Sequence, residues 1–286
     1  MDLRHILTGT DFSDSSKGGV RESLRLAQAS AARRVTLLHV TAEIKDAVAL
    51  RQRMREWLQG IPEYTALDDP EGRVAVDLEQ GRITSGLERC AARIGATQII
   101  VGPLPRNFTE RYLTGAIAEQ LFHSTRVPVL ATRAPATGGY RHVLVPMDFS
   151  DNSRRALAAA ASLIRDCPGA AAPDARIELL HVASIPGGAR TTQAGRSLFA
   201  SMAQEFEEKM TEMARQEGVE DLVDGVRALQ GVVQEAIPVE ARKCGADLVC
   251  MSSSSSRGFF GSTVDAVLRN IDIPMLVAPA APLAAG

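Results

Sequence analysis

Two aspartates in matching segments are the first residues whose surroundings suggest chemistry. Asp11 lies in HILTGTDFSD at residues 5–14, and Asp148 lies in HVLVPMDFSD at residues 142–151. Each follows a short apolar run and precedes residues that favour a helix start. At a strand end, such a carboxylate can accept a hydrogen bond from a ribose or base donor, or it can cap the next helix. Both roles stay open, and Thr10 joins the candidate binding residues as the neighbour of Asp11.

A glycine-bounded loop in the first half is the second candidate. Gly102 follows an apolar run, and Gly115 enters a helix signal. The backbone N–H groups of such a loop, together with a helix N-terminus, can cradle a phosphate. Pro105, Arg106 and Ala116 belong to the same candidate site.

The corresponding loop of the second half is rich in serine and shorter. Five residues separate Ser255 from Gly261, whereas nine separate the matching positions of the first half. Serine hydroxyls can replace missing backbone donors toward a phosphate. The candidate binding residues of this loop are Ser252, Ser255, Gly261, Ser262 and Thr263.

Signatures of catalysis and of metal binding are missing. The chain contains no GxxxxGK(S/T), GxGxxG, GxSxG or HExxH motif. His39 and His181 lie among apolar residues, which favours hydrogen-bonded structural histidines over catalytic bases. The four cysteines form no CxxC pair and do not occupy matching positions, so their spacing predicts reduced thiols and neither a disulfide framework nor a zinc site. No catalytic residue and no metal ligand is assigned.

Apolar runs and amphipathic stretches alternate along the first half. This order predicts an α/β fold, a doubly wound (Rossmann-like) domain with a five-stranded parallel sheet and helices on both faces. The expected strands are His5–Thr10, Val35–Val40, Val74–Leu78, Gln98–Val101 and Val127–Thr132. The expected helices are one that ends near Ala32 and those at Asp46–Leu58, Ile83–Ile94 and Gly115–His123.

The second half repeats the first, which predicts two tandem domains. The LHV at residues 38–40 returns at 180–182, and Gly95 returns as Gly245. The predicted division is a first domain at 1–133, a linker rich in proline and glycine at 134–140, and a second domain at 141–286.

Two segments of the second half have no counterpart in the first. Pro168–Pro173 is expected to be a surface loop inserted before the second strand. A helix is expected over about 192–217, and it would either cap a cleft or a partner surface or extend into solvent.

Composition and charge exclude several classes of protein. With 45% hydrophobic and 23% charged residues, the chain resembles an ordinary soluble globular protein. The net charge of −2 and the absence of a basic stripe argue against a nucleic-acid partner. No basic-then-apolar leader and no long apolar run are present, so we expect a cytoplasmic protein without a membrane partner.

In combination, these motifs resemble the universal stress protein family, specifically its tandem form with two domains in one chain. The similarity covers almost the whole chain: the aspartate after strand one, LHV in strand two, Gly-Ala before strand four, glycine at the last helix, and Pro-(Val/Met)-Leu in strand five. The resemblance implies ATP or AMP as the ligand, with Mg²⁺ as a candidate companion ion. It implies that Asp11 and Val40 face ribose and adenine in the first domain, and that Asp148 and Val182 do so in the second.

The two phosphate loops depart from the family pattern, G-x2-G-x9-G-(S/T), in different ways. The first keeps the spacing, but Pro105 has no N–H and Ala116 has no hydroxyl. The second keeps Gly261 and Ser262 but is four residues shorter and has serines in place of both early glycines. Arg106 and Arg257 are either phosphate ligands or solvated loop residues.

The leading hypothesis is a stress-response protein without strong enzymatic activity that binds adenine nucleotide in at most one of its two degenerate sites. The alternative is a partner-binding or structural stress module that has lost nucleotide binding, and the third hypothesis is a slow nucleotide hydrolase. The resemblance also implies intramolecular pairing of the two domains. A homodimer and an unknown protein partner remain open.

Overall fold

A computed structural model describes residues 2–14, 16–30, 32–102, 111–132, 138–184, 193–253 and 263–280. The chain divides into two compact units. The first unit is Met1–Gly139 together with Asp166–Ala170, and the second is Tyr140–Arg165 together with Ala171–Gly286.

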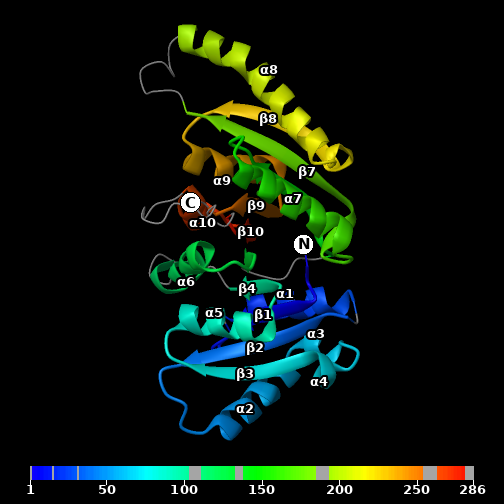
Figure 1. Cartoon of the computed structure of the whole chain (residues 1–286), viewed down its shortest axis with the longest axis vertical. Helices are drawn as coiled ribbons and strands as arrows, with labels where there is room; N and C mark the ends of the chain where they lie inside the picture. Colours follow the sequence, from blue (N-terminus) through cyan, green and yellow to red (C-terminus); the bar gives the residue numbers. More distant parts are fainter. Residues whose placement is uncertain are drawn as a thin grey trace, which may run out of the picture. The chain divides into compact units, whose positions relative to one another are not determined.

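The strands of the first unit form a parallel sheet in the order β3-β2-β1-β4-β5, in which β2 and β3 lie side by side (Figure 1). The chain winds outward from β1 to β3 and then returns to β4 beside β1, so the winding reverses between β1 and β4. Ligands of doubly wound sheets bind beyond the carboxyl ends of the strands at this reversal. The strands are β1 (His5–Gly9), β2 (Arg34–Thr41), β3 (Val74–Gln80), β4 (Gln98–Val101) and β5 (Val129–Ala131).

The helices of the first unit connect these strands. Two short helices that the sequence pattern did not predict, α3 and α4, each begin with a proline, whose fixed φ suits the first helical position. The helices are α1 (Lys17–Gln28), α2 (Ala47–Gln59), α3 (Pro62–Thr65), α4 (Pro70–Arg73), α5 (Ile83–Ile94) and α6 (Arg111–Ser124). The first helix ends about a turn earlier than expected, and α6 begins four residues before the predicted Gly115.

The apolar residues of the central strands form the core of the first unit. Each is at most 1% exposed, because a parallel sheet covered by helices buries both faces of its strands. They include Ile6, Leu7, Val35, Leu37, Leu38, Ile99 and Ile100.

A buried arginine holds the carboxyl end of α1. The guanidinium of Arg73, 6% exposed, donates to the carbonyl oxygens of Arg33 at 3.2 Å and Ser30 at 2.6 Å, and also to that of Ala27. The carbonyls of Ala27 and Ser30 also accept backbone amides, at 3.2 and 3.1 Å, so the guanidinium adds a charged donor to these groups just where α1 ends.

We expect Arg73→Met to lower the free energy of unfolding by about 2 kcal/mol, because it leaves buried carbonyls without a charged donor. Arg53→Met, on the exposed face of α2, is the matched control and should change stability by less than about 0.5 kcal/mol. Urea denaturation followed by circular dichroism measures both, and equal stabilities of the two variants would contradict the assignment.

The second unit repeats this architecture, with a parallel sheet in the order β10-β9-β6-β7-β8. The predicted doubly wound α/β fold is therefore confirmed in both halves. Its strands are β6 (Tyr140–Pro146), β7 (Ala171–Ala183), β8 (Val223–Gln230), β9 (Leu248–Ser252) and β10 (Met275–Ala278). Its helices are α7 (Asp151–Asp166), α8 (Gln193–Gln216), the 3₁₀ turn η1 (Glu220–Leu222), α9 (Val233–Cys244) and α10 (Thr263–Asn270).

The prediction of a surface loop at Pro168–Pro173 is wrong in its second half. Residues 171–173 are the start of β7, and Ala170 and Ala172 are at most 3% exposed. The cause is an earlier start of β6, since Tyr140 pairs with Ala171 and gives the alanine-rich backbone a strand to pair with. The insertion lengthens a strand instead of adding a loop.

The predicted helix at about 192–217 is confirmed as α8. Met210, Met213 and Ala214 are buried, so this stretch packs against the sheet and does not extend freely into solvent. In the described part of the chain, no helix combines the length and the apolar character that crossing a membrane requires.

Candidate functional site

The turn after β1 holds Asp11 by hydrogen bonds from Ser13. The Asp11 carboxylate is exposed, and its Oδ1 accepts from the Ser13 amide at 3.0 Å and from the Ser13 hydroxyl at 2.6 Å. The Ser13 hydroxyl in turn accepts from the amide of Ser16, just before α1, at 3.2 Å. Ser13 thus connects Asp11 to Ser16, the N-cap residue of α1, whose own side chain makes no capping bond. The predicted capping role of Asp11 is therefore replaced by a chain of hydrogen bonds through Ser13.

The second unit builds the same turn. The exposed Asp148 accepts from the Ser150 amide at 3.0 Å and from the Ser150 hydroxyl, and the latter accepts from the Ser153 amide at 3.2 Å. The serine two residues after each aspartate is a functional position that the sequence analysis missed. Its signal was the repeated Asp-Phe-Ser.

The Thr10 hydroxyl belongs to the turn of the first unit. Its Oγ1 lies 2.9 Å from the Ser16 hydroxyl and accepts from the Phe12 amide at 3.1 Å. Thr10 is 7% exposed. These contacts assign the hydroxyl a role in shaping the turn.

A phenylalanine in left-handed backbone conformation follows each aspartate. Phe12 and Phe149 both have φ of +64°, which is uncommon for a bulky residue. Such a conformation persists only where its surroundings hold it. The Phe12 ring lies 4.7 Å from the His39 ring and 5.9 Å, edge to face, from Trp57, and these contacts fix the turn.

Both strand-two histidines are hydrogen-bonded to this turn. Nδ1 of His39 lies 2.9 Å from the Thr10 carbonyl oxygen, and Nδ1 of His181 lies 2.7 Å from that of Met147. The predicted hydrogen bonding of both histidines is confirmed. In the second unit the ring of Phe206, from α8, also lies 4.5 Å from the His181 ring.

The two valines that follow the histidines differ in exposure. Val40 is half-buried, whereas Val182 is 8% exposed. In the first unit Gly86 of α5 approaches closely, since a Cβ there would lie 2.9 Å from a methyl carbon of Val40. The second unit has Ala236 at the position that matches Gly86. The valine beside Asp11 is thus more accessible to a ligand than the valine beside Asp148.

Gly102 at the end of β4 is required by packing. A Cβ there would lie 2.5 Å from the carbonyl oxygen of Thr132 and 3.2 Å from the amide nitrogen of Gly19 in α1. In the second unit Ser252 takes this place, and its hydroxyl donates to the Ala278 carbonyl at 3.2 Å. The backbone at the end of β4 therefore approaches its neighbours more closely than the backbone at the end of β9 does.

Several of the predicted phosphate-loop residues lie outside the described part of the chain. Gly115 and Ala116 lie in α6, but their side-chain surroundings are not described, and Thr263 is the exposed first residue of α10. Pro105, Arg106, Ser255, Gly261 and Ser262 are not described.

Hydrogen bonds lower the pKa of Asp11. Burial is the largest single influence and raises the pKa, but the hydrogen bonds from Ser13, Ser16 and the backbone of Asp11 together lower it below its ordinary value. A carboxyl group with a depressed folded pKa stabilises the fold above its unfolded pKa of about 4, and this contribution disappears as the pH falls through the folded value.

Asp11→Asn keeps an acceptor oxygen and removes the charge. We expect wild type to be more stable than this variant at neutral pH, with a difference that shrinks as the pH falls below about 4. Urea unfolding at a series of pH values measures the difference, and a gap that stays constant from neutral to acidic pH would contradict the charge effect.

Comparisons with known proteins agree with this fold and its duplication. The model of the Universal stress protein family matches the chain twice, at residues 2–133 and 139–279. A functionally unknown protein from Pseudomonas aeruginosa PAO1 is similar in structure, with a TM-score of 0.67, 18% identity, and coverage of 97% of this chain and 92% of that chain. A comparison with curated proteins gives no match.

Two further structures are similar over almost their whole length. A putative universal stress protein from Pseudomonas aeruginosa UCBPP-PA14 has a TM-score of 0.67 and 17% identity, covering 97% of this chain and 93% of that chain. A universal stress protein from Archaeoglobus fulgidus DSM 4304 has a TM-score of 0.65 and 19% identity, with coverage of 96% on both sides. At such identities the likeness concerns the fold alone.

Two doubly wound domains that follow one another, each with the same turn geometry after its first strand, define the class as a tandem α/β protein. Because the family model matches both halves, the chain belongs to the universal stress protein family, in its two-domain form.

Proposed function

We propose that this universal stress protein is a non-enzymatic stress-response protein that binds one adenine nucleotide, ATP or AMP, at the carboxyl ends of β1, β2 and β4 in its first unit. The observation that carries the proposal is the pairing of an exposed, rigidly held carboxylate, Asp11, with the half-buried Val40 on the neighbouring strand. The two are held together because the Thr10 amide donates to the Leu38 carbonyl at 2.9 Å.

This pair offers the contacts that a nucleoside requires. A carboxylate whose Oδ1 is fixed by two hydrogen bonds loses little conformational freedom when a ribose hydroxyl binds it. The half-buried valine offers apolar surface to a base. Phosphates would then extend toward the loop after Gly102, whose nine-residue spacing matches the family pattern.

The second unit supports a different role. Val182 is buried, Phe206 packs against His181, and the phosphate loop is four residues shorter. These features favour the alternative function, partner binding or a structural role, for the second unit alone. Pairing of the two domains, a homodimer and an unknown protein partner remain predictions.

The non-enzymatic part of the proposal rests on the sequence, which contains none of the catalytic motifs named above. His39 and His181 each donate Nδ1–H to a backbone carbonyl, which holds the ring against its turn and leaves Nε2 as the basic nitrogen. We further propose a cytoplasmic location and no role for nucleic acid or membrane, as the composition and charge suggest.

Thermal shift assays with ATP, ADP and AMP, with and without Mg²⁺, test the binding proposal. We expect the intact chain to be stabilised by millimolar ATP or AMP. Absence of any shift at these concentrations would refute nucleotide binding. Release of phosphate or AMP above the buffer control, abolished by Asp11→Ala, would instead support the slow hydrolase.

A further inference from the structure

Three side chains with metal-binding chemistry converge in the second unit. His142 lies near the start of β6, Glu178 lies on the neighbouring β7, and Cys244 is the last residue of α9. Their ligand atoms all lie within 4.8 Å of one another. Nε2 of His142 is 3.2 Å from Oε2 of Glu178.

This cluster lies away from the carboxyl ends of the strands, where the nucleotide-binding residues are predicted. Asp148 and Val182 lie at the carboxyl ends of β6 and β7, whereas His142 is the third residue of β6 and Cys244 precedes β9 at the amino end of the sheet. The function proposed above therefore does not account for it.

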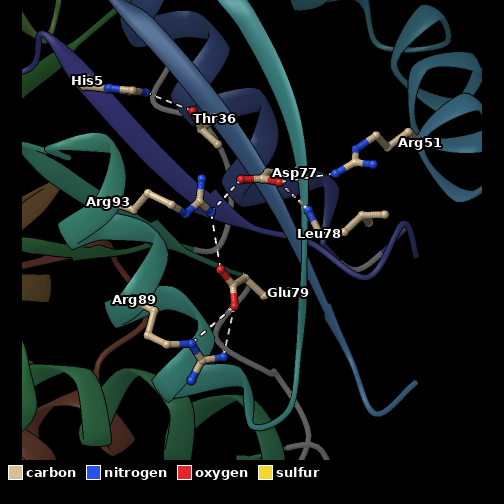
Figure 2. A network of polar contacts seen from close by, with 8 residues as sticks. All are labelled: His5, Thr36, Arg51, Asp77, Leu78, Glu79, Arg89 and Arg93. Atoms are coloured by element: carbon tan, nitrogen blue, oxygen red, sulfur yellow. Dashed lines mark hydrogen bonds and ion pairs between the residues drawn. The ribbon is translucent and has the colours of Figure 1, made fainter. Parts of the chain in front are cut away.

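The first unit provides an internal comparison. His5 pairs in register with Arg34 and Leu7 with Thr36, as His142 does with Arg176 and Leu144 with Glu178, so Thr36 is the counterpart of Glu178. Figure 2 shows the first-unit version, in which Nε2 of His5 lies 2.9 Å from the Thr36 hydroxyl.

The counterpart of Cys244 is Ile94. Each is the last residue of its helix and precedes a glycine in left-handed conformation, Gly95 or Gly245. The second unit thus keeps the histidine and has a carboxylate and a thiol where the first unit has a hydroxyl and an alkyl group. Each of these two differences places a potential metal ligand beside His142.

The Glu178 carboxylate is buried with one oxygen incompletely satisfied. The side chain is 8% exposed, and Oε1 has no hydrogen bond, although Nη2 of Arg227 forms an ion pair with it at 3.5 Å. Arg227 also pairs with the buried Glu240, which Lys243 approaches at 3.4 Å. Because two carboxylates balance these two cations, the surroundings carry no excess positive charge to repel a metal ion.

The chemical types of the three side chains favour zinc as the metal. Imidazole, thiolate and carboxylate are the ligands of Zn²⁺, with bonds of about 2.0–2.3 Å that place neighbouring ligand atoms about 3–4 Å apart. The His142–Glu178 pair already has this spacing, and the Cys244 sulfur has to approach by about 1 Å. The carboxyl end of α9, where the thiol lies, carries the negative end of the helix dipole and favours a cation.

We propose that His142, Glu178 and Cys244 bind one Zn²⁺ ion, with a fourth coordination position left for water. Cysteine spacing alone could not reveal this site, because its three ligands come from separate elements and only one is a cysteine.

Isothermal titration of the full-length, chelator-treated protein with Zn²⁺ tests the proposal, with Mg²⁺ as the negative control. We expect one Zn²⁺ per chain, and at least a 10-fold weaker affinity in Cys244→Ser and in Glu178→Thr, which installs the first-unit residue. Cys90→Ala removes a buried thiol of the first unit and should leave zinc binding unchanged. Circular dichroism checks that each variant is folded.

Cobalt substitution gives a second readout that does not depend on affinity. Co²⁺ bound to the wild-type chain should show a thiolate charge-transfer absorption that Cys244→Ser lacks. No zinc uptake by wild type, or the same stoichiometry and affinity in Cys244→Ser, would overturn the proposal and leave the cluster as an ion-pair network.

Discussion

Gly102→Ala is expected to lower the free energy of unfolding by about 3 kcal/mol, because the new methyl group would meet only backbone atoms that cannot move separately. It would lie 2.5 Å from the Thr132 carbonyl oxygen and 3.2 Å from the Gly19 amide nitrogen. Relief of this contact requires α1 or the end of β5 to shift. Urea denaturation followed by the fluorescence of Trp57, the only tryptophan, measures the loss.

Gly60→Ala is the matched control for this substitution. A Cβ at Gly60 would meet its nearest atom, the Trp57 carbonyl oxygen, at 3.4 Å, and its φ of −82° suits any residue. We expect a change of less than about 0.5 kcal/mol. Equal stabilities of Gly102→Ala and Gly60→Ala would contradict the claim that the close backbone approach at the end of β4 requires glycine.

Asp11→Ala is expected to weaken nucleotide binding by about 10- to 100-fold, the effect of losing one hydrogen bond to a charged group. Asp148→Ala should leave the affinity unchanged, since the second unit buries the valine beside its aspartate. Isothermal titration with ATP and AMP measures all variants.

Asp14→Ala controls for the loss of negative charge in the same turn. Asp14 is exposed and forms an ion pair with Lys17 at 2.6 Å, but it does not hold Ser13 as Asp11 does. It should bind nucleotide like wild type. Equal losses in Asp11→Ala and Asp148→Ala would mean that the units bind equivalently.

Hydrophobic patterning was sufficient to predict most of the fold. Continuous apolar runs such as residues 35–40 identified buried strands, and β2 extends only one residue beyond that prediction at either end. The pattern failed at Pro168–Pro173, because alanine and proline do not indicate whether a partner strand is available. There the earlier start of β6 decided the outcome.

The candidate site was predictable in its residue types but not in its conformation. The repeated Asp-Phe-Ser identified Asp11 and also carried the local signal for Ser13, but it did not indicate that Phe12 adopts a left-handed backbone. That conformation is held by tertiary contacts, namely the His39 ring and its bond to the Thr10 carbonyl. Local patterns do not encode such contacts.

The stoichiometry of nucleotide binding to the full-length chain tests the central claim most directly. Isothermal titration of the wild-type protein with ATP or AMP should give one nucleotide per chain, with the heat strongly reduced in Asp11→Ala and retained in Asp148→Ala. Two nucleotides per chain, or a single one lost in Asp148→Ala and retained in Asp11→Ala, would contradict the assignment of the site to the first unit.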